Sequence, residues 1–116
     1  IWIREIAPDP VMLFRYSAIT FNGHRIHYDR KYVTEVEGYP GLIVHGPLTA
    51  GLLLELALDN RPGETLTHFR FQARAPLFDI APFHVAGKPS EDDRAVELWS
   101  VTPEGNLGTL ARAEFA

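Results

Sequence analysis

The chain has 116 residues, a net charge of -4 at neutral pH and no cysteine. This length predicts one domain with its own core, and the negative charge argues against non-specific nucleic-acid binding, which needs a basic surface. Without thiols the chain can form neither disulfides nor thiolate zinc sites, and no apolar run is long enough to cross a bilayer. We expect a protein of the cytoplasm, or of the mitochondrial matrix in a eukaryote.

The N-terminal part of the chain carries two candidate elements. Residues 1–10, IWIREIAPDP, begin extended and end in a Pro-Asp-Pro segment that cannot continue a helix. We expect an edge strand there, or a linker from an upstream domain, and assign residues 11–116 to a single domain. Residues 11–21, VMLFRYSAITF, suit either a strand or a short helix, because they are rich in apolar, β-branched and aromatic side chains.

The clearest element is a helix predicted over residues 47–60, PLTAGLLLELALDN. Pro47 suits the first turn of a helix, where its missing N–H is no loss. Leucine and alanine cover nearly the whole circumference, and a helix that is apolar all round is buried on most sides. The segment NRPG at 60–63 ends the helix with a proline and a glycine.

After this helix, apolar and polar residues alternate with the two-residue period of β-strands. In residues 67–74, Phe69, Phe71 and Ala73 alternate with polar side chains, as in a half-buried strand. Three more strands are predicted, at 82–89, 94–102 and 106–116. The turn PEGN makes the last two a hairpin. One antiparallel sheet wrapped around one apolar helix predicts an α+β domain of the hot-dog architecture.

A crowded polar stretch, FNGHRIHYD, occupies residues 21–29. His24 and His27 would share one face if this segment were helical, and His45 could then complete a metal site. Zinc sites are marked by cysteines or by carboxylates at fixed spacing, and this stretch has neither pattern. We therefore expect no metal here.

A structural interpretation of the same stretch stays open. Asn22 and Gly23 are a turn-forming pair, and Asp29 could cap a short helix at 30–36. Polar loop residues usually satisfy backbone groups in this way.

A second stretch, LIVHGPLTA at residues 42–50, lies at the start of the apolar helix. The backbone N–H of Gly46 would sit at the positive end of the helix dipole, where an oxyanion is stabilised. The presence of this second stretch favours a catalytic interpretation of residues 21–29.

Together, FRYSAITFNGHRIHYD and EVEGYPGLIVHGPLTA resemble the MaoC-like hot-dog hydratases and dehydratases, which act on acyl thioesters. The likeness is strongest to the branch of mesaconyl-CoA hydratase and mitochondrial 3-hydroxyacyl-ACP dehydratase type 2. It is dense over residues 11–50 and weaker through residues 74–87 and the last two strands. The resemblance implies a hydro-lyase that adds water reversibly to an enoyl-CoA or enoyl-ACP. Mesaconyl- and itaconyl-CoA are the implied C4–C5 candidates.

The resemblance also implies catalytic roles. In the family motif G-D-x-N-P-x-H the aspartate and the histidine hold the reacting water, and these positions align with Asn22 and His27. His24 falls on the motif's asparagine and Arg25 on its proline. An amide can orient water but cannot exchange a proton at neutral pH. We therefore expect His27 to carry the proton transfers alone or with help from Asp29.

The family's His-Gly element before the central helix matches His45 and Gly46, so the Gly46 N–H is expected to polarise the thioester carbonyl. Arg25 and Arg15 could hold a second carboxylate of a dicarboxylic substrate, although an ordinary ion pair explains them equally well. The substrate-binding residues implied are Arg25, His24, His45 and Asp29. No metal and no redox cofactor is implied, and the acyl group is carried on coenzyme A or acyl carrier protein.

The resemblance implies the C-terminal half of an enzyme with two hot-dog domains, paired side by side at the acyl-thioester tunnel. We therefore expect a homodimer or pairing with a second hot-dog domain, and neither nucleic acid nor membrane as a partner. Two alternatives stay open. A hot-dog acyl-CoA thioesterase would use Glu55 in the apolar helix, and a non-catalytic acyl-thioester-binding or assembly subunit would have lost its active dyad at Asn22.

Overall fold

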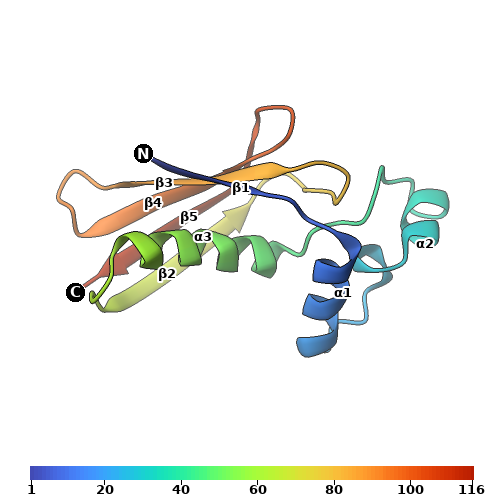
Figure 1. The fold of residues 1–116 in the computed structure, drawn as a ribbon, viewed down its shortest axis with the longest axis horizontal. Helices are drawn as coiled ribbons and strands as arrows, with labels where there is room; N and C mark the ends of the chain where they lie inside the picture. The colour runs from blue at the N-terminus through green and yellow to red at the C-terminus, as the bar shows by residue number, and fades with distance from the viewer.

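The computed structural model describes all residues, 1–116, as a five-stranded antiparallel sheet with a long helix across one face (Figure 1). The strand order in the sheet is β1-β3-β4-β5-β2. The elements in chain order are β1 Trp2–Ile6, α1 Pro10–Ile19, the 3₁₀ helix η1 Arg25–His27, α2 Arg30–Glu35, α3 Gly46–Asn60, β2 Leu66–Ala73, β3 Phe83–Pro89, β4 Ala95–Val101 and β5 Leu107–Phe115. This confirms the α+β hot-dog architecture, including the predicted helix, the four predicted strands and the hairpin.

The core lies between α3 and the sheet. Leu53, Leu56 and Ala57 of α3 are buried, and they belong to one apolar cluster with Val85 of β3 and Val96 of β4. The sequence favours a helix here because leucine and alanine are strong helix formers and dominate the segment. Packing of this helix on the sheet fixes where its N-terminus lies.

One face of α3 stays open to solvent, so its burial is less complete than the sequence predicted. Gly51, Glu55 and Leu58 are exposed, and the neighbouring Leu48 and Leu52 are only half-buried. A sheet covers one side of a helix, and this domain supplies no second layer for the other side. The apolar residues on the open side are available to a further layer.

The N-terminal segment forms an edge strand followed by a helix. β1 pairs antiparallel with β3, from Trp2 opposite Gly87 to Ile6 opposite Phe83. Residues 11–21, for which both a strand and a helix were considered, lie mostly in α1. The side chain of Asp9 caps this helix by accepting a hydrogen bond from the backbone N–H of Met12 at 2.9 Å.

β2 lies at the opposite edge of the sheet and pairs only with β5. Its predicted alternation of buried and exposed side chains is only partly realised. Phe69 is half-buried, but Phe71 is 46% exposed. Phe71 lies at the unpaired edge, so no neighbouring strand of this domain covers it.

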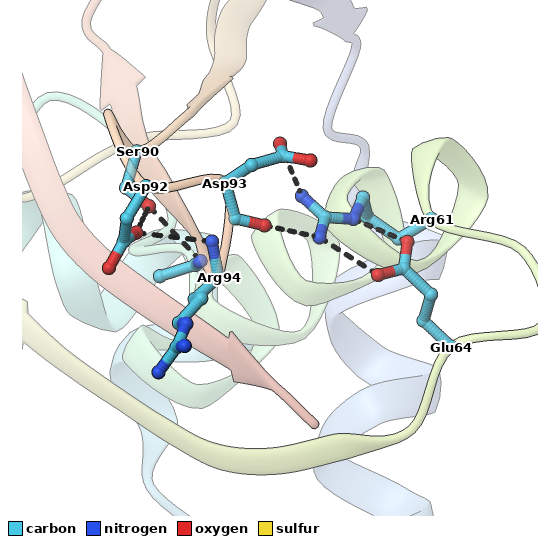
Figure 2. Close-up of polar contacts among 7 residues, drawn as sticks. Arg61, Glu64, Ser90, Asp92, Asp93 and Arg94 are labelled. Atoms are coloured by element: carbon cyan, nitrogen blue, oxygen red, sulfur yellow. Dashed lines mark hydrogen bonds and ion pairs between the residues drawn. The ribbon is translucent and has the colours of Figure 1, made fainter.

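A polar cluster anchors the C-terminal end of α3 to the turn between β3 and β4 (Figure 2). The guanidinium of Arg61 donates hydrogen bonds to Glu64 at 2.8 Å and to the backbone oxygen of Asp93 at 2.7 Å. Its charge also lies over the ring of Phe115, 5.1 Å from the centroid. The pKa of Glu64 is lowered, chiefly by its hydrogen bond from Arg61. This anchor helps to hold α3 along the sheet.

The short helices gather at the other end of α3. Figure 1 shows α1 and α2 beyond the sheet, next to the N-terminal end of α3, so the polar stretch 21–29 and the His-Gly pair come close together. No helix of the structure has the length and apolar character needed to cross a membrane.

Candidate active site

His27 is the last residue of η1 and only 7% exposed. Its Nδ1 lies 2.6 Å from the carbonyl oxygen of Ile43. Because a carbonyl oxygen can only accept, Nδ1 carries the proton in the neutral ring and Nε2 holds the lone pair. The backbone N–H of Ile43 in turn donates to the carbonyl of Ile26 at 2.9 Å, so Ile43 connects the segment before α3 to η1 at two consecutive residues.

His45 directly precedes α3 and packs against His27. The two imidazole rings are stacked, with centroids 3.7 Å apart and an interplanar angle of 18°. His45 is 1% exposed, and its Nε2 lies 2.7 Å from the hydroxyl of Ser17 on α1. Its other ring nitrogen, Nδ1, is buried without a hydrogen-bond partner. The structure therefore joins three separate segments at one pair of rings.

Both histidines favour the neutral form. The pKa of His27 is lowered mainly by burial; the Ile43 carbonyl opposes this, and the nearby His24 adds to the lowering. Burial and then the proximity of His27 lower the pKa of His45 to about 4. At pH 7 both rings are therefore uncharged, and His27 is free to act as a base while stacked on His45.

Asn22 serves the turn that precedes η1. Its side-chain oxygen accepts a hydrogen bond from the backbone N–H of His24 at 3.0 Å, and the hydroxyl of Tyr28 donates to the carbonyl of Gly23 at 2.9 Å. The exposed ring of His24 lies edge-on to His27, with centroids 6.1 Å apart. The turn interpretation of Asn22 is therefore realised, while its role towards water stays a prediction.

Asp29 and Arg25 form an ion pair, and Asp29 also caps α2. Asp29 caps this helix by accepting from the Tyr32 N–H at 3.0 Å, and it accepts from Arg25 Nη2 at 2.9 Å. The cap and the arginine together lower the pKa of the Asp29 carboxyl. Arg25 also lies over the ring of Tyr32 at 4.1 Å. The capped helix was predicted at 30–36, and α2 ends at Glu35.

Gly46 is the first residue of α3, next to His45. The N–H groups of a first helical turn have no acceptor within the helix and lie at its positive end. A Cβ added to Gly46 would meet no atom within 4 Å, so the space in front of this backbone is open. The position suits a donor to an oxyanion bound beside the histidines.

A cavity of about 310 Å³ lies beside these residues. Its lining is mostly apolar, with two polar side chains, and consists of Phe14, Ser17, Ala18, Phe21, Asn22, Gly23 and Tyr28. A larger hollow of about 540 Å³ surrounds Trp99 and Leu110 on β4 and β5. Trp99 follows the buried Leu98 along β4 and so points to the sheet face away from α3. The smaller cavity is the one next to the histidine pair, because Ser17, which lines it, is hydrogen-bonded to His45.

Several predicted residues are not brought to this site. Glu55 lies ten positions after His45, about 15 Å along the axis of α3 at the usual helical rise. Its side chain is 62% exposed and pairs with Arg4 at 3.8 Å. Arg15 is exposed on α1. No three histidine, aspartate or glutamate side chains are grouped so that they could hold a metal ion.

Two partners of the histidines, Ser17 and Ile43, were missed by the sequence analysis. Ile43 acts through its backbone carbonyl, which no side-chain pattern reveals. Ser17 lies within the quoted stretch FRYSAITF, and its place on the inner face of a helix would have marked it once a helix was chosen there. Asp79 was also missed, although it contacts neither histidine: it accepts a hydrogen bond from the Leu42 N–H at 3.0 Å and pairs with Arg30, which holds the segment that leads to Ile43.

Known proteins resemble this chain along much of its length. The family model of hydroxyacyl-thioester dehydratase type 2 matches residues 1–79. Mesaconyl-C(4)-CoA hydratase of Chloroflexus aurantiacus is 49% identical over 112 residues, which cover 97% of this chain and 39% of that protein. The mitochondrial hydroxyacyl-thioester dehydratase type 2 of Schizosaccharomyces pombe is 36% identical over 86 residues, 72% of this chain and 28% of that protein. The chain thus spans well under half the length of either relative.

Solved structures share the fold. The (R)-hydratase of A. caviae involved in PHA biosynthesis superposes with a TM-score of 0.82 at 18% identity, over 97% of this chain and 89% of that chain. The HadBC 3R-hydroxyacyl-ACP dehydratase complex of Mycobacterium tuberculosis gives 0.78 at 13% identity, over 97% of this chain and 90% of that chain. The family model covers more than half of the sequence, and the first relative is similar along nearly all of it. The chain therefore belongs to the hydroxyacyl-thioester dehydratase type 2 family.

Proposed function

We propose that this chain provides the active site of an acyl-thioester hydratase or dehydratase, which adds water reversibly to an enoyl thioester. The observation that carries the proposal is the position of His27 beside the start of α3. Its Nδ1–H is bonded to Ile43, which leaves Nε2 as the base, and Gly46 begins α3 next to the stacked His45. A base and an oxyanion donor are the two groups that this reaction requires.

In the hydration direction, Nε2 of His27 takes a proton from water while the water oxygen bonds to the β-carbon. The electrons of the C=C bond move towards the thioester, and its carbonyl oxygen becomes an enolate oxyanion. The N–H of Gly46 stabilises that charge. The imidazolium of His27 then gives its proton to the α-carbon, and the carbonyl forms again. One water is consumed and no electrons are exchanged, so the chemistry calls for no redox group.

We propose an acyl group carried on coenzyme A or acyl carrier protein, with mesaconyl- and itaconyl-CoA as the first C4–C5 candidates. Support comes from the relative at 49% identity, whose name records mesaconyl-C(4)-CoA. The cytoplasm, or the mitochondrial matrix in a eukaryote, is the proposed location; one relative is named as mitochondrial.

A second hot-dog domain is the proposed partner, either another copy of this chain or a further domain of a longer polypeptide. Two features support it. β2 leaves one edge of the sheet unpaired, with Phe71 46% exposed, and an unpaired strand offers N–H and C=O groups to another strand. α3 also keeps an open side with Leu58 exposed. Sedimentation equilibrium of the complete protein tests this pairing.

The test of the function follows two signals on one sample. Crotonyl-, mesaconyl- and itaconyl-CoA are supplied in turn, the enoyl absorbance is recorded, and free thiol is measured with a colour reagent. Loss of enoyl absorbance without thiol release is expected. Thiol release without that loss would identify a thioesterase, and binding of the thioesters with neither signal would identify a non-catalytic subunit.

A further inference from the structure

The stacked histidines depend on very few polar contacts. His27 has the Ile43 carbonyl at Nδ1, and His45 has the Ser17 hydroxyl at Nε2. Nδ1 of His45 is buried and has no partner, so the Ser17 hydroxyl makes the only hydrogen bond of that ring. The orientation of His45 within its plane therefore rests on one contact.

The hydroxyl of Ser17 makes this contact and no other. It is 5% exposed, lies on the inner side of α1 and forms part of the lining of the 310 Å³ cavity. Its hydroxyl belongs to a helix far from His45 in the sequence, since the two bonded side chains are 28 positions apart. Through Ser17, α1 is attached directly to the residue that precedes α3.

Because the two rings are stacked, the orientation of His27 depends on that of His45. Terminal ring torsions of histidine are broad, so a ring held by a single hydrogen bond can tilt unless a neighbour blocks it. The face of His45 lies 3.7 Å from His27 and nearly parallel to it. The His45 ring also contacts the ring of Tyr16, with centroids 4.7 Å apart and an interplanar angle of 59°. A turn of the His45 ring would remove the flat support beneath the proposed base.

The support must also remain uncharged while His27 holds a proton. The titratable groups that face the pair are His24 and Tyr16, and the pair itself consists of His27 and His45. A neutral imidazole face stabilises a cation above it, whereas two stacked imidazolium rings would repel one another. The Ser17 hydroxyl can donate to or accept from Nε2, so it satisfies a neutral ring in either tautomer.

We propose that Ser17 is a positioning residue: its hydroxyl holds the His45 ring, and His45 holds the His27 ring at the angle needed for proton transfer. The inference rests on the proposed hydratase function for its kinetic consequence. Its structural content, the dependence of His27 on the Ser17 hydroxyl, does not require that function.

The kinetic test compares Ser17→Ala and Ser17→Thr with the unchanged protein, each as the complete protein. Ser17→Ala is expected to lower kcat for the enoyl thioester roughly ten- to hundredfold, since a small misplacement of a reacting group has an effect of that size. KM should stay within about twofold, because the Ser17 hydroxyl is already bonded to His45 and its removal takes only one atom from the cavity wall. Ser17→Thr keeps a hydroxyl and should retain most of kcat.

The second readout is an NMR titration of the histidine rings, which needs no substrate. In the unchanged protein His27 should titrate below 6.5, and in Ser17→Ala its pKa should rise towards 6.5, because a loosened ring is better hydrated. If no acyl thioester is hydrated by the unchanged protein, the proposed function fails and this titration alone decides the role of Ser17.

Ser100→Ala is the matched control. Ser100 is a fully buried serine on β4, and its hydroxyl accepts a hydrogen bond from the Thr109 N–H at 2.7 Å, away from the histidines. It should lower the melting temperature with no change in kcat or in the His27 titration. If alanine at position 17 prevents folding, Ser17→Cys replaces it, because cysteine fills a similar space with only a weak donor. The same fall in kcat and the same rise in the pKa of His27 are then expected, and their absence overturns the proposal.

The proposal is overturned if Ser17→Ala folds and leaves both kcat and the His27 titration unchanged. It is equally overturned if Ser17→Ala and Ser17→Thr lose activity to the same extent, since the volume of the side chain would then matter and not its hydroxyl.

Discussion

The carbonyl oxygen of Ile43 lies 2.6 Å from Nδ1 of His27 and fixes which nitrogen of that ring is free. The same residue uses its N–H to hold Ile26, one position before the histidine. Ile43 thus sets both the backbone next to His27 and the tautomer of its ring. A residue that contributes only backbone atoms decides that Nε2 is the basic nitrogen.

Replacing His27 with alanine removes the proposed base. We expect kcat/KM for hydration to fall by about two to four orders of magnitude, with the circular dichroism spectrum and oligomeric state unchanged. His68→Ala is the control, because His68 is an exposed histidine on β2 whose ring contacts only Thr67 and Glu114 by polar atoms. An unimpaired His27→Ala protein would remove this histidine from the mechanism.

The lowered pKa of His45 predicts that the folded protein loses stability in acid. Its pKa is about 4 in the folded protein and near 6.5 in an unfolded chain, so between these values the unfolded state binds more protons. Above pH 6.5 the ring is neutral in both states and has no effect on stability; as the pH falls from 6.5 to about 4, the unfolded chain gains a proton that the folded protein does not, and the folded state is progressively destabilised. The free energy of unfolding should drop by about 2 kcal/mol from this group between pH 7 and pH 5.

The measurement is urea unfolding at several pH values, with His45→Gln beside the unchanged protein. His27 acts in the same direction, since its pKa is also lowered, and it is present in both proteins. The pH dependence should therefore be weaker in His45→Gln. Identical slopes in the two proteins would show that His45 does not titrate in this way.

Asp29 is expected to matter for stability more than for catalysis. Asp29→Asn should lower the melting temperature, because the carboxylate both caps α2 and holds Arg25. Its kcat should stay close to that of the unchanged protein, since His27 transfers the protons. A large fall in kcat, with the pH profile displaced, would assign Asp29 the assisting role that the sequence left open.

The sequence predicted the parts of this site that short motifs mark. His27, His45 and Gly46 were singled out as candidates from two such motifs, and the helix and strands from their periods. Ile43 was missed because every residue has a carbonyl, and Ser17 was missed because residues 11–21 suited two kinds of element. The open side of α3 could not be predicted, since the pattern shows that a helix is apolar but not what covers it.

Asn22→Asp tests the departure from the family motif. Aspartate can accept the same hydrogen bond from the His24 N–H, so the turn should persist. A carboxylate can exchange a proton where the amide cannot, so we expect kcat to rise at least about tenfold. Its negative charge should also raise the pKa of His27, moving the acid limb of the kcat/KM profile to higher pH. An unchanged rate would mean that His27 works without an acid partner.

Gly46 can be tested through its backbone N–H alone. Proline is favoured in the first turn of a helix, and the extended backbone of His45, with φ -60° and ψ 136°, is the conformation that a following proline requires. Gly46→Pro therefore deletes the N–H while α3 can still form. If that N–H stabilises the oxyanion, kcat should fall by about two to three orders of magnitude.

Gly46→Ala separates the N–H from the space that a side chain occupies. It keeps the donor, and its methyl group would meet no atom from elsewhere in the fold within 4 Å. We expect alanine to raise KM modestly with little change in kcat, because any clash would be with the bound thioester. Equal losses of kcat in the two variants would point to crowding of the substrate, and the oxyanion donor would then have to be sought among the later N–H groups of the first turn of α3.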